Sequence, residues 1–368
     1  MTLLRITLRR LIGEPAFTAT VLLTLALCIA ANVAIFAVVD AILVRSLPLP
    51  EPSRLVVVFN GYPGAGVERA AASVANYFDR REGLRSFSSI SLMQDGMIGV
   101  GAEGAPQRVP MARVTPEFFT TLQVPLALGR PFADAELTYG TDEVAILTHE
   151  FWQTHFDGDP KVLGRTFIND GITITVVGVL PSGFRFLSSP ARFFRPLSHD
   201  PQLRSPDSRH NNNAMMIARL APGVTAAAAQ AELDAFNANL IANDPLAELI
   251  RNAGYHTTVY PLHADHVRTI KPILLLLQAG VLFLLLIGAV NLANLLLIRA
   301  SGRTKELSVR QALGASRRHI IRDAALETVL LALVGGGLGL LLGAFGIELL
   351  GRLGTGQLPL GTTIVFDG

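Results

Sequence analysis

Residues 272–298 read PILLLLQAGVLFLLLIGAVNLANLLLI, a run of 27 residues without a charged side chain. At about 1.5 Å of rise per residue, a helix of this length reaches across the roughly 30 Å hydrocarbon core of a bilayer. A buried core helix of a soluble protein is usually shorter and carries a polar face. We therefore predict that this stretch is a membrane-spanning helix.

Two further runs share this property, residues 16–39 and 328–347. The first is much longer than the roughly 7–15 apolar residues of a signal peptide, and Asp40-Ala41 does not read as a cleavage site, so we expect it to remain as an anchor. Half of the chain is hydrophobic and only 16% is charged, below the roughly 25% of ordinary soluble domains. The predicted spans are residues 16–44, 272–298 and 325–350.

Basic residues gather next to the spans in two segments. Arginines precede the first span, and a basic loop separates the second from the third. The positive-inside rule predicts that both segments are cytoplasmic. The long stretch between the first two spans has acidic and basic residues in nearly equal number, so we expect it on the other side. The predicted division is a cytoplasmic segment 1–15, an extracytoplasmic domain 45–271, a cytoplasmic loop 299–324 and an extracytoplasmic tail 351–368.

The extracytoplasmic stretch predicts an α+β domain, because short β-rich runs alternate with helical ones. Ser73 and Thr148 each stand at a position typical of an N-cap, and we expect a further helix from Thr225 to about Asn243. Thr115 before Pro116 predicts a further cap, opening a short helix over residues 117–122. We expect strands at residues 55–59, 107–114, 143–147, 215–220 and 256–262, and a hairpin over 165–180 that turns at Asp170-Gly171.

Motifs for catalysis or cofactor binding are incomplete. His149-Glu150 begins like a zinc-binding helix, but Gln153 stands where the second histidine belongs. His263 and His266 read better as a solvated turn beside the membrane than as metal ligands. The sequence contains neither a Gly-x-x-x-x-Gly-Lys phosphate loop nor a Gly-x-Ser-x-Gly elbow. We therefore expect no catalytic residue, metal or cofactor in this chain and no nucleic-acid partner, and any ATP is expected to be bound by a partner subunit.

Polar and small residues inside the spans predict helix packing. Asn291 and Asn294 lie three residues apart on one face of the second span, and their amides need partners in lipid. Gly335, Gly339 and Gly343 form a small-x-x-x-small repeat that lets another helix approach closely. We expect these residues to contact neighbouring helices, either of the same chain or across a dimer.

The cytoplasmic loop is basic and amphipathic, and residues 299–317 read RASGRTKELSVRQALGASR. On charge alone it could be a lever or a surface helix held by anionic lipid. The stretch resembles the loop of MacB/FtsX-type ABC transporter permeases, where Arg-Thr-x-Glu-Ile/Leu-x-x-Arg-x-Ala-Leu-Gly-Ala engages a cytoplasmic ATPase. The resemblance assigns ATPase coupling to Arg303, Thr304, Glu306, Leu307, Arg310, Ala312, Leu313, Gly314 and Ala315. We call residues 299–324 the coupling loop.

The resemblance runs from about residue 18 to residue 350. Gly129-Arg-Pro-Phe132 and Val176-Val-Gly-Val179 are similar to the periplasmic core domain of the same family. The likeness is greatest to the branch of duplicated permeases whose ATPase is often not encoded alongside. The sequence departs from the family in having no fourth span after the third and no second repeat, so we expect an N-terminal fragment.

The resemblance implies an α-helical membrane protein with an inserted α+β extracytoplasmic domain of the MacB-like periplasmic core type. It implies a non-enzymatic, multi-pass permease subunit in the bacterial inner membrane that transmits motion from a separate ATPase to the periplasmic domain. Drugs, toxins, peptides or lipoproteins would be expelled. The implied partners are the ABC ATPase, the lipid bilayer and a second copy or repeat, with a periplasmic adaptor protein left open. Two alternatives are a membrane-anchored binding or sensor scaffold and a membrane-bound hydrolase.

Overall fold

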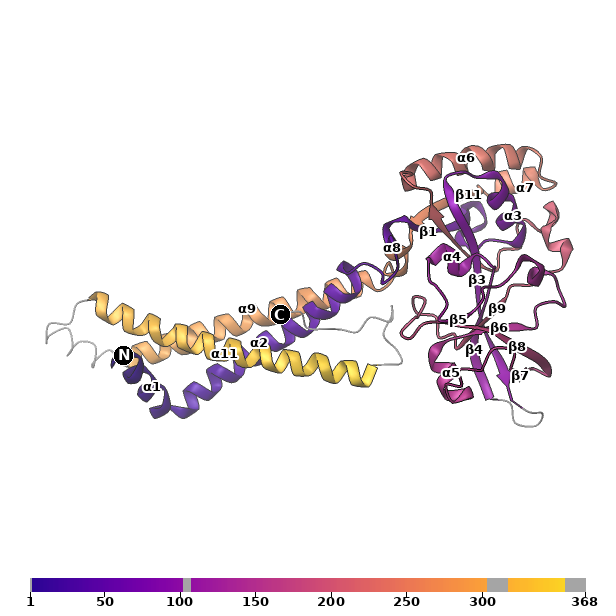
Figure 1. The fold of residues 1–368 in the computed structure, drawn as a ribbon. Coiled ribbons are helices and arrows are strands. Elements are labelled where there is room, and N and C mark those ends of the chain that lie inside the picture. The colour runs from indigo at the N-terminus through magenta and orange to yellow at the C-terminus, as the bar shows by residue number, and fades with distance from the viewer. Residues whose placement is uncertain (1, 102–106, 303–316, 355–368) are drawn as a thin grey trace. The chain divides into compact units, whose positions relative to one another are not determined.

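The computed structural model describes residues 2–101, 107–302 and 317–354 of the chain (Figure 1). The described residues form two compact units. One unit is helical and contains residues 2–45, 268–302 and 317–354, and we call it the bundle. The other contains residues 46–267 except for 102–106, is built on a β-sheet, and is called the β domain.

The bundle contains three helices, among the described residues, that are long and apolar enough to cross a membrane. The candidate spans are Pro15–Val44, Lys271–Gly302 and Ala324–Leu349. The helices themselves are α1 (Thr2–Gly13), α2 (Pro15–Val39), α9 (Lys271–Gly302) and α11 (Arg317–Gly354). Helix α2 packs against both α9 and α11, so it forms the centre of the unit. Which end faces which compartment stays a prediction.

Local chemistry explains how α2 starts and how its polar side chains are satisfied. Pro15 lies in its first turn, where a missing N–H costs no hydrogen bond. Inside the helix the hydroxyls of Thr20 and Thr24 donate to carbonyl oxygens one turn earlier, at 2.8 Å each, which satisfies polar groups within an apolar segment. The helix continues as a short π-helical turn, η1 (Asp40–Val44).

The β domain has one mixed sheet. Its strands are β1 (Leu55–Tyr62), β2 (Val67–Ala70), β3 (Phe87–Val100), β4 (Gln107–Val114), β5 (Leu128–Gly129), β6 (Val144–Leu147), β7 (Thr166–Asn169), β8 (Ile172–Val179), β9 (Phe193–Pro196), β10 (Met215–Leu220) and β11 (His256–Pro261). Their order is β11-β1-β10-β3-β4-β9-β6-β8-β5, with β2 beside β1, and β7 beside β3 and β8. Most pairs are antiparallel, but β4 with β9 and β6 with β8 are parallel. The predicted α+β class is confirmed.

Strand β3 joins two hydrophobic cores. Residues 87–93 of β3 pair with β10, and residues 93–100 pair with β4. The first core includes Val56, Leu92 and Leu233, and the second includes Leu147 and Phe193. We call the parts of the β domain around these cores the first and the second lobe. The two lobes are therefore connected by one continuous strand, β3.

Helices cover the sheet of the β domain (Figure 1). They are α3 (Val74–Gly83), α4 (Phe118–Leu122), α5 (His149–Phe156), α6 (Ala226–Ala242), α7 (Ala247–Asn252) and α8 (Leu262–His266). The predicted caps are confirmed: Ser73 and Thr148 accept hydrogen bonds from backbone N–H groups in the first turns of α3 and α5. Thr225 caps α6 in the same way. The hairpin at Asp170-Gly171 is confirmed as well, and both turn residues have positive φ, 45° and 80°.

The cap predicted at Thr115 is wrong. Helix α4 begins at Phe118 after Glu117, without a side-chain cap. The Thr115 hydroxyl instead accepts a hydrogen bond from the backbone N–H of Leu92 at 3.0 Å. The Thr115 hydroxyl therefore satisfies a buried backbone N–H group of β3 and does not cap the helix.

Candidate functional site

The residues predicted for ATPase coupling lie outside the described residues. The described chain stops at Gly302 and resumes at Arg317. The residues concerned are Arg303, Thr304, Glu306, Leu307, Arg310, Ala312, Leu313, Gly314 and Ala315. Their role stays a prediction, and the site is built here from the helices that the coupling loop joins, α9 and α11.

Arg299, near the end of α9, contacts two other parts of the bundle. Its Nε atom lies 2.9 Å from Glu14 Oε2, between α1 and α2, and its Nη1 atom pairs with Glu327 on α11. The guanidinium also lies over the ring of Phe17, 4.3 Å from Cζ to the centroid. The side chains of Arg299 and Glu327 are only 9% and 12% exposed. We call Glu14, Phe17, Arg299 and Glu327 the arginine cluster.

The arginine cluster ties three helices together at both ends of the coupling loop. A charge held between apolar helices is costly unless an opposite charge accompanies it. Arg299 therefore stabilises an arrangement in which α9 and α11 stay close to the start of α2. Sequence reasoning missed this cluster, although two glutamates beside otherwise basic segments were a visible signal.

The predicted glycine repeat lies against α2 of the same chain. A Cβ atom at Gly335 would come within 2.9 Å of Leu25 Cβ, and one at Gly339 within 2.7 Å of Ile29 Cβ. At Gly343 the nearest atom would be Val33 Cγ1, at 2.9 Å. These distances are shorter than real Cβ contacts, so the three glycines set how closely α11 approaches α2.

The two asparagines predicted to bond across helices are exposed on α9. Neither Asn291 nor Asn294 hydrogen-bonds to any residue in the described part of the chain. Asn32 on α2 makes such a bond instead, because its amide donates to the carbonyl of Val281 on α9 at 2.8 Å and to that of Cys28 at 3.0 Å. An amide within an apolar run was the signal that could have identified Asn32.

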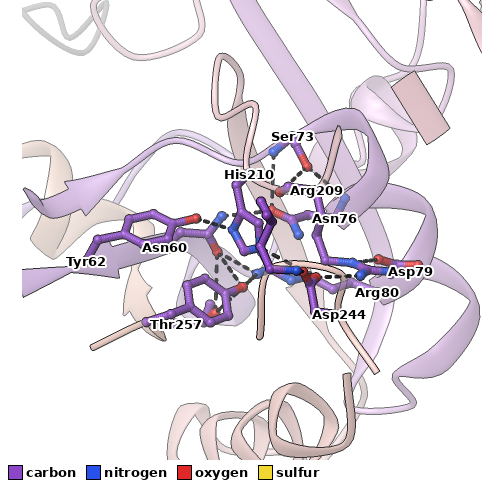
Figure 2. Close-up of polar contacts among 12 residues, drawn as sticks. Asn60, Tyr62, Ser73, Asn76, Asp79, Arg80, Arg209, His210, Asp244 and Thr257 are labelled. Carbon is purple, nitrogen blue, oxygen red and sulfur yellow. Dashed lines mark hydrogen bonds and ion pairs between the residues drawn. The ribbon is translucent and has the colours of Figure 1, made fainter. Parts of the chain in front are cut away.

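A buried polar cluster fills the first lobe of the β domain (Figure 2). At its centre is Arg80 on α3, which is 1% exposed. Its Nη2 atom donates to Asn60 Oδ1 at 2.6 Å and to Thr257 Oγ1 at 3.2 Å. No carboxylate of the described residues pairs with Arg80, so this buried cation depends on neutral acceptors from β1 and β11.

A second arginine in the same cluster has carboxylate partners. Arg209, in the loop before β10, donates to Asp79 on α3 and to Asp244 after α6, each at 2.8 Å. His210 follows it and hydrogen-bonds through Nδ1 with the Tyr62 hydroxyl at 2.8 Å. Figure 2 shows these side chains meeting from four separate segments, so the cluster holds the first lobe together.

Burial shifts the titration of this cluster. Burial raises the pKa of Tyr62 to about 12, and burial lowers the pKa of His210 despite the nearby Asp244 carboxylate. For Asp244, burial acts to raise the pKa, but the Leu246 N–H and Arg209 outweigh it and lower the pKa overall. At neutral pH the cluster therefore contains a neutral histidine and an ionised aspartate.

The histidines before the second span contact neighbouring residues of the β domain. His266 Nε2 lies 3.1 Å from Ser188 Oγ. Asp265 pairs with Arg69, whose guanidinium lies between the rings of Phe59 and Tyr260. Across the described ranges, no three His, Cys, Asp or Glu side chains meet in a way that could hold a metal ion.

Two protein families match this sequence. The MacB-like periplasmic core domain matches residues 18–236. The FtsX-like permease C-terminal domain matches residues 279–366. The first match alone covers more than half of the chain, and the second covers most of the second span, the coupling loop and the third span.

Curated relatives are similar to parts of the chain. The macrolide export ATP-binding/permease protein MacB of Neisseria gonorrhoeae is 25% identical over 236 residues, which are 62% of this chain and 34% of the relative. The pyoverdine export ATP-binding/permease protein PvdT of Pseudomonas syringae pv. tomato is 27% identical over 61% of this chain and 33% of its own length. The chain thus spans about a third of these relatives.

Two solved structures are similar to parts of the chain. The periplasmic region of MacB from Actinobacillus actinomycetemcomitans aligns with a TM-score of 0.40 and 12% identity, covering 60% of this chain and 94% of that one. A domain of a permease protein from Porphyromonas gingivalis aligns with a TM-score of 0.44 and 15% identity, covering 58% of this chain and 93% of that one.

Proposed function

Because the chain belongs to the MacB-like periplasmic core domain family, we propose that it is the permease subunit of an ABC-type export machine. In this proposal a separate cytoplasmic ATPase moves the coupling loop, and the bundle passes the motion to the β domain in the periplasm. Drugs, toxins, peptides or lipoproteins are the classes of cargo. The names of the relatives, which include export and ATP-binding, support this assignment.

The arginine cluster is the observation that carries the mechanical part of the proposal. Arg299 is the first residue of the coupling loop, Glu327 lies three residues beyond its end, and the two form an ion pair in space. A displacement of the loop would therefore act on α9 and α11 together. Glu14 links the same arginine to the start of α2, and α2 leads directly into the chain of the β domain. Close contacts at the glycine repeat support movement of α2 and α11 as one body.

The partners follow from the same reasoning. We infer an ABC ATPase below the membrane and a second copy of the chain, or a second repeat, beside it. The exposed amides of Asn291 and Asn294 support such a neighbour, because polar groups facing lipid are costly. The proposal does not require a periplasmic adaptor protein. The proposed location is the bacterial inner membrane.

The competing function is a membrane-anchored binding or sensor scaffold that needs no ATP. The two proposals differ in the coupling loop, which only an ATP-driven machine requires. The experiment first isolates the full-length protein from membranes and identifies any nucleotide-binding subunit that accompanies it. ATP hydrolysis and cargo export are then measured in vesicles with Glu306→Ala and, as a matched control, Lys305→Ala, because position 305 is variable in the family pattern.

We expect Glu306→Ala to abolish export while Lys305→Ala leaves it unchanged. Equal export by both variants, or no associated ATPase, would favour the scaffold. Accessibility labelling adds an independent test of geometry. Residues 45–271 and 300–322 must react from opposite sides of the membrane, and labelling of both from one side would contradict the proposal.

A further inference from the structure

A cavity of about 390 Å³ lies in the β domain beside the first hydrophobic core, against which Phe78 of its wall packs. Helix α3 of the first lobe contributes Phe78, Arg81 and Glu82. The remaining wall comes from a segment after β5, which includes Asp134 and Leu137, and from a segment after β9, which includes His199 and Arg204. Its volume falls within the roughly 300–1,000 Å³ of small-molecule sites.

The floor of this cavity is apolar and aromatic. Leu137 is 5% exposed and His199 is 8% exposed. The ring centroids of His199 and Phe78 are 5.3 Å apart. The backbone N–H of His199 donates to the carbonyl of Leu137 at 3.1 Å, which fixes the two segments against each other. Such a floor accommodates an apolar or aromatic side chain.

His199 adds one unused polar atom to this floor. Its Nδ1 is buried and has no hydrogen-bond partner among the described residues. Burial lowers the pKa of His199, and the neighbouring Arg204 adds to the effect. The ring is therefore neutral at pH 7, so that Nδ1 can accept or donate one hydrogen bond according to its tautomer.

The rim of the cavity carries two loose ion pairs. Arg204 lies 3.8 Å from Glu82, and Arg81 lies 3.4 Å from Asp134. Both distances exceed the roughly 2.7–2.9 Å of a well-formed charged hydrogen bond. The two acids are largely exposed, 72% for Glu82 and 68% for Asp134. These groups can therefore exchange their present partners for a ligand at little cost.

The two arginines differ in how firmly they are held. Arg81 pairs with Glu117 at 2.8 Å and donates to the Tyr77 hydroxyl at 2.9 Å. Arg204 instead stacks on the ring of Phe78, with Cζ 3.7 Å from the centroid. Stacking covers one face of the guanidinium and leaves its N–H edge for a planar anion.

We propose that this cavity binds a free α-amino acid with an apolar side chain. The carboxylate pairs with Arg204, and the ammonium lies between Glu82 and Asp134. The side chain rests on Phe78, Leu137 and His199. A lone anion would meet two acids at the rim, and a lone cation would meet two arginines, so the mixed rim favours a zwitterion. Because α3 and the segments after β5 and β9 all supply contacts, the bound amino acid stabilises the position of these three segments relative to one another.

The test measures binding of L-phenylalanine to the full chain in lipid nanodiscs by titration calorimetry. It needs no ATPase and does not depend on the export proposal. We expect saturable binding of L-phenylalanine and none of N-acetyl-L-phenylalanine amide, which lacks both charges. Arg204→Ala should weaken binding by about tenfold or more, the effect of losing a charged hydrogen-bonded partner. Glu82→Gln should weaken it as well.

Arg165→Ala is the matched control. The Arg165 side chain is similarly exposed, at 52%, and it forms an ion pair of 3.1 Å with Asp159. Arg165 does not line this cavity. The Arg165→Ala variant should bind L-phenylalanine like the unmodified chain. The thermal unfolding midpoint of each variant verifies that the β domain is folded. Absence of saturation up to about 10 mM, equal binding of the amide, or equal weakening by Arg165→Ala would each overturn the proposal.

Discussion

Arg299 of α9 and Glu327 of α11 form a nearly buried ion pair at the two ends of the coupling loop. Glu14 contacts the same guanidinium from the junction of α1 and α2. The pair thus links α9 and α11 directly, in addition to the covalent connection that the coupling loop provides. Its energetic contribution is measurable without any partner protein.

Replacing Arg299 with Gln should destabilise the bundle by about 3–5 kcal/mol, because the nearly buried carboxylate of Glu327 would be left without its cation. Unfolding of the full chain by sodium dodecyl sulfate, followed by far-UV circular dichroism, measures the change. Arg318→Gln is the control, since Arg318 is exposed at the start of α11. An equal effect of both substitutions would show that the ion pair contributes nothing specific.

The glycine repeat predicts a contrast between two neighbouring positions on α11. Gly339→Ala would place a Cβ atom 2.7 Å from Ile29 Cβ, whereas Gly337→Ala would meet no atom within 4 Å. We expect Gly339→Ala to cost about 1–3 kcal/mol through overpacking. Gly337→Ala should be neutral or slightly stabilising, since alanine favours helix. The same detergent titration compares them, and equal stability would rule out close α2–α11 contact.

The buried cation of the first lobe predicts a loss of stability on truncation. Arg80→Ala removes the 2.6 Å hydrogen bond to Asn60 Oδ1, which keeps only donors at 3.4 Å, from the hydroxyls of Tyr255 and Thr257. We expect a cost of about 1–3 kcal/mol for this buried, poorly satisfied acceptor. The thermal unfolding midpoint of the β domain within the full chain should fall. Arg85→Ala serves as the control on the exposed side of the same region, and a similar fall there would contradict the assignment.

The β domain should lose stability as the pH falls from about 6.5. The folded pKa of His210 is lowered by burial, so the unfolded chain binds the proton at a higher pH than the folded chain. The stability is complete above the unfolded pKa and is lost as the pH falls towards the folded one. His155, His199 and His266 are shifted in the same direction.

Thermal unfolding between pH 7.5 and about 5 measures this dependence. His210→Asn should reduce the decrease in midpoint on acidification, because one titrating group is removed. His256→Asn, at an exposed position on β11, should leave the decrease as it is. A pH-independent midpoint in the unmodified chain would contradict the prediction.

Local signals in the sequence were sufficient for the spans, the α+β class and several element ends. A run of 27 residues without charge needs no tertiary context to indicate a membrane helix. The caps at Ser73 and Thr148 depend on hydrogen bonds within one turn. The turn at Asp170-Gly171 depends on two residues that tolerate positive φ. Each of these features is settled within a few residues.

Strand β3 shows where local signals fail. Residues 87–100 include serines, Gln94, Asp95 and Gly96, and this composition gives only a weak signal for a strand. Pairing with β10 at one end and β4 at the other stabilises it. The hydroxyl of Thr115 was diverted from its predicted cap by the same strand.

The sequence by itself determined which helices are long and apolar enough to cross a membrane and which segment forms the α+β domain, because charge and hydrophobicity act residue by residue. Only the tertiary structure decided which side chains meet. Arg299 finds Glu14 and Glu327, and Arg204 stacks on Phe78, across long separations in the chain. Such contacts depend on how whole elements pack, since an ion pair or a cavity wall has no counterpart in the local pattern.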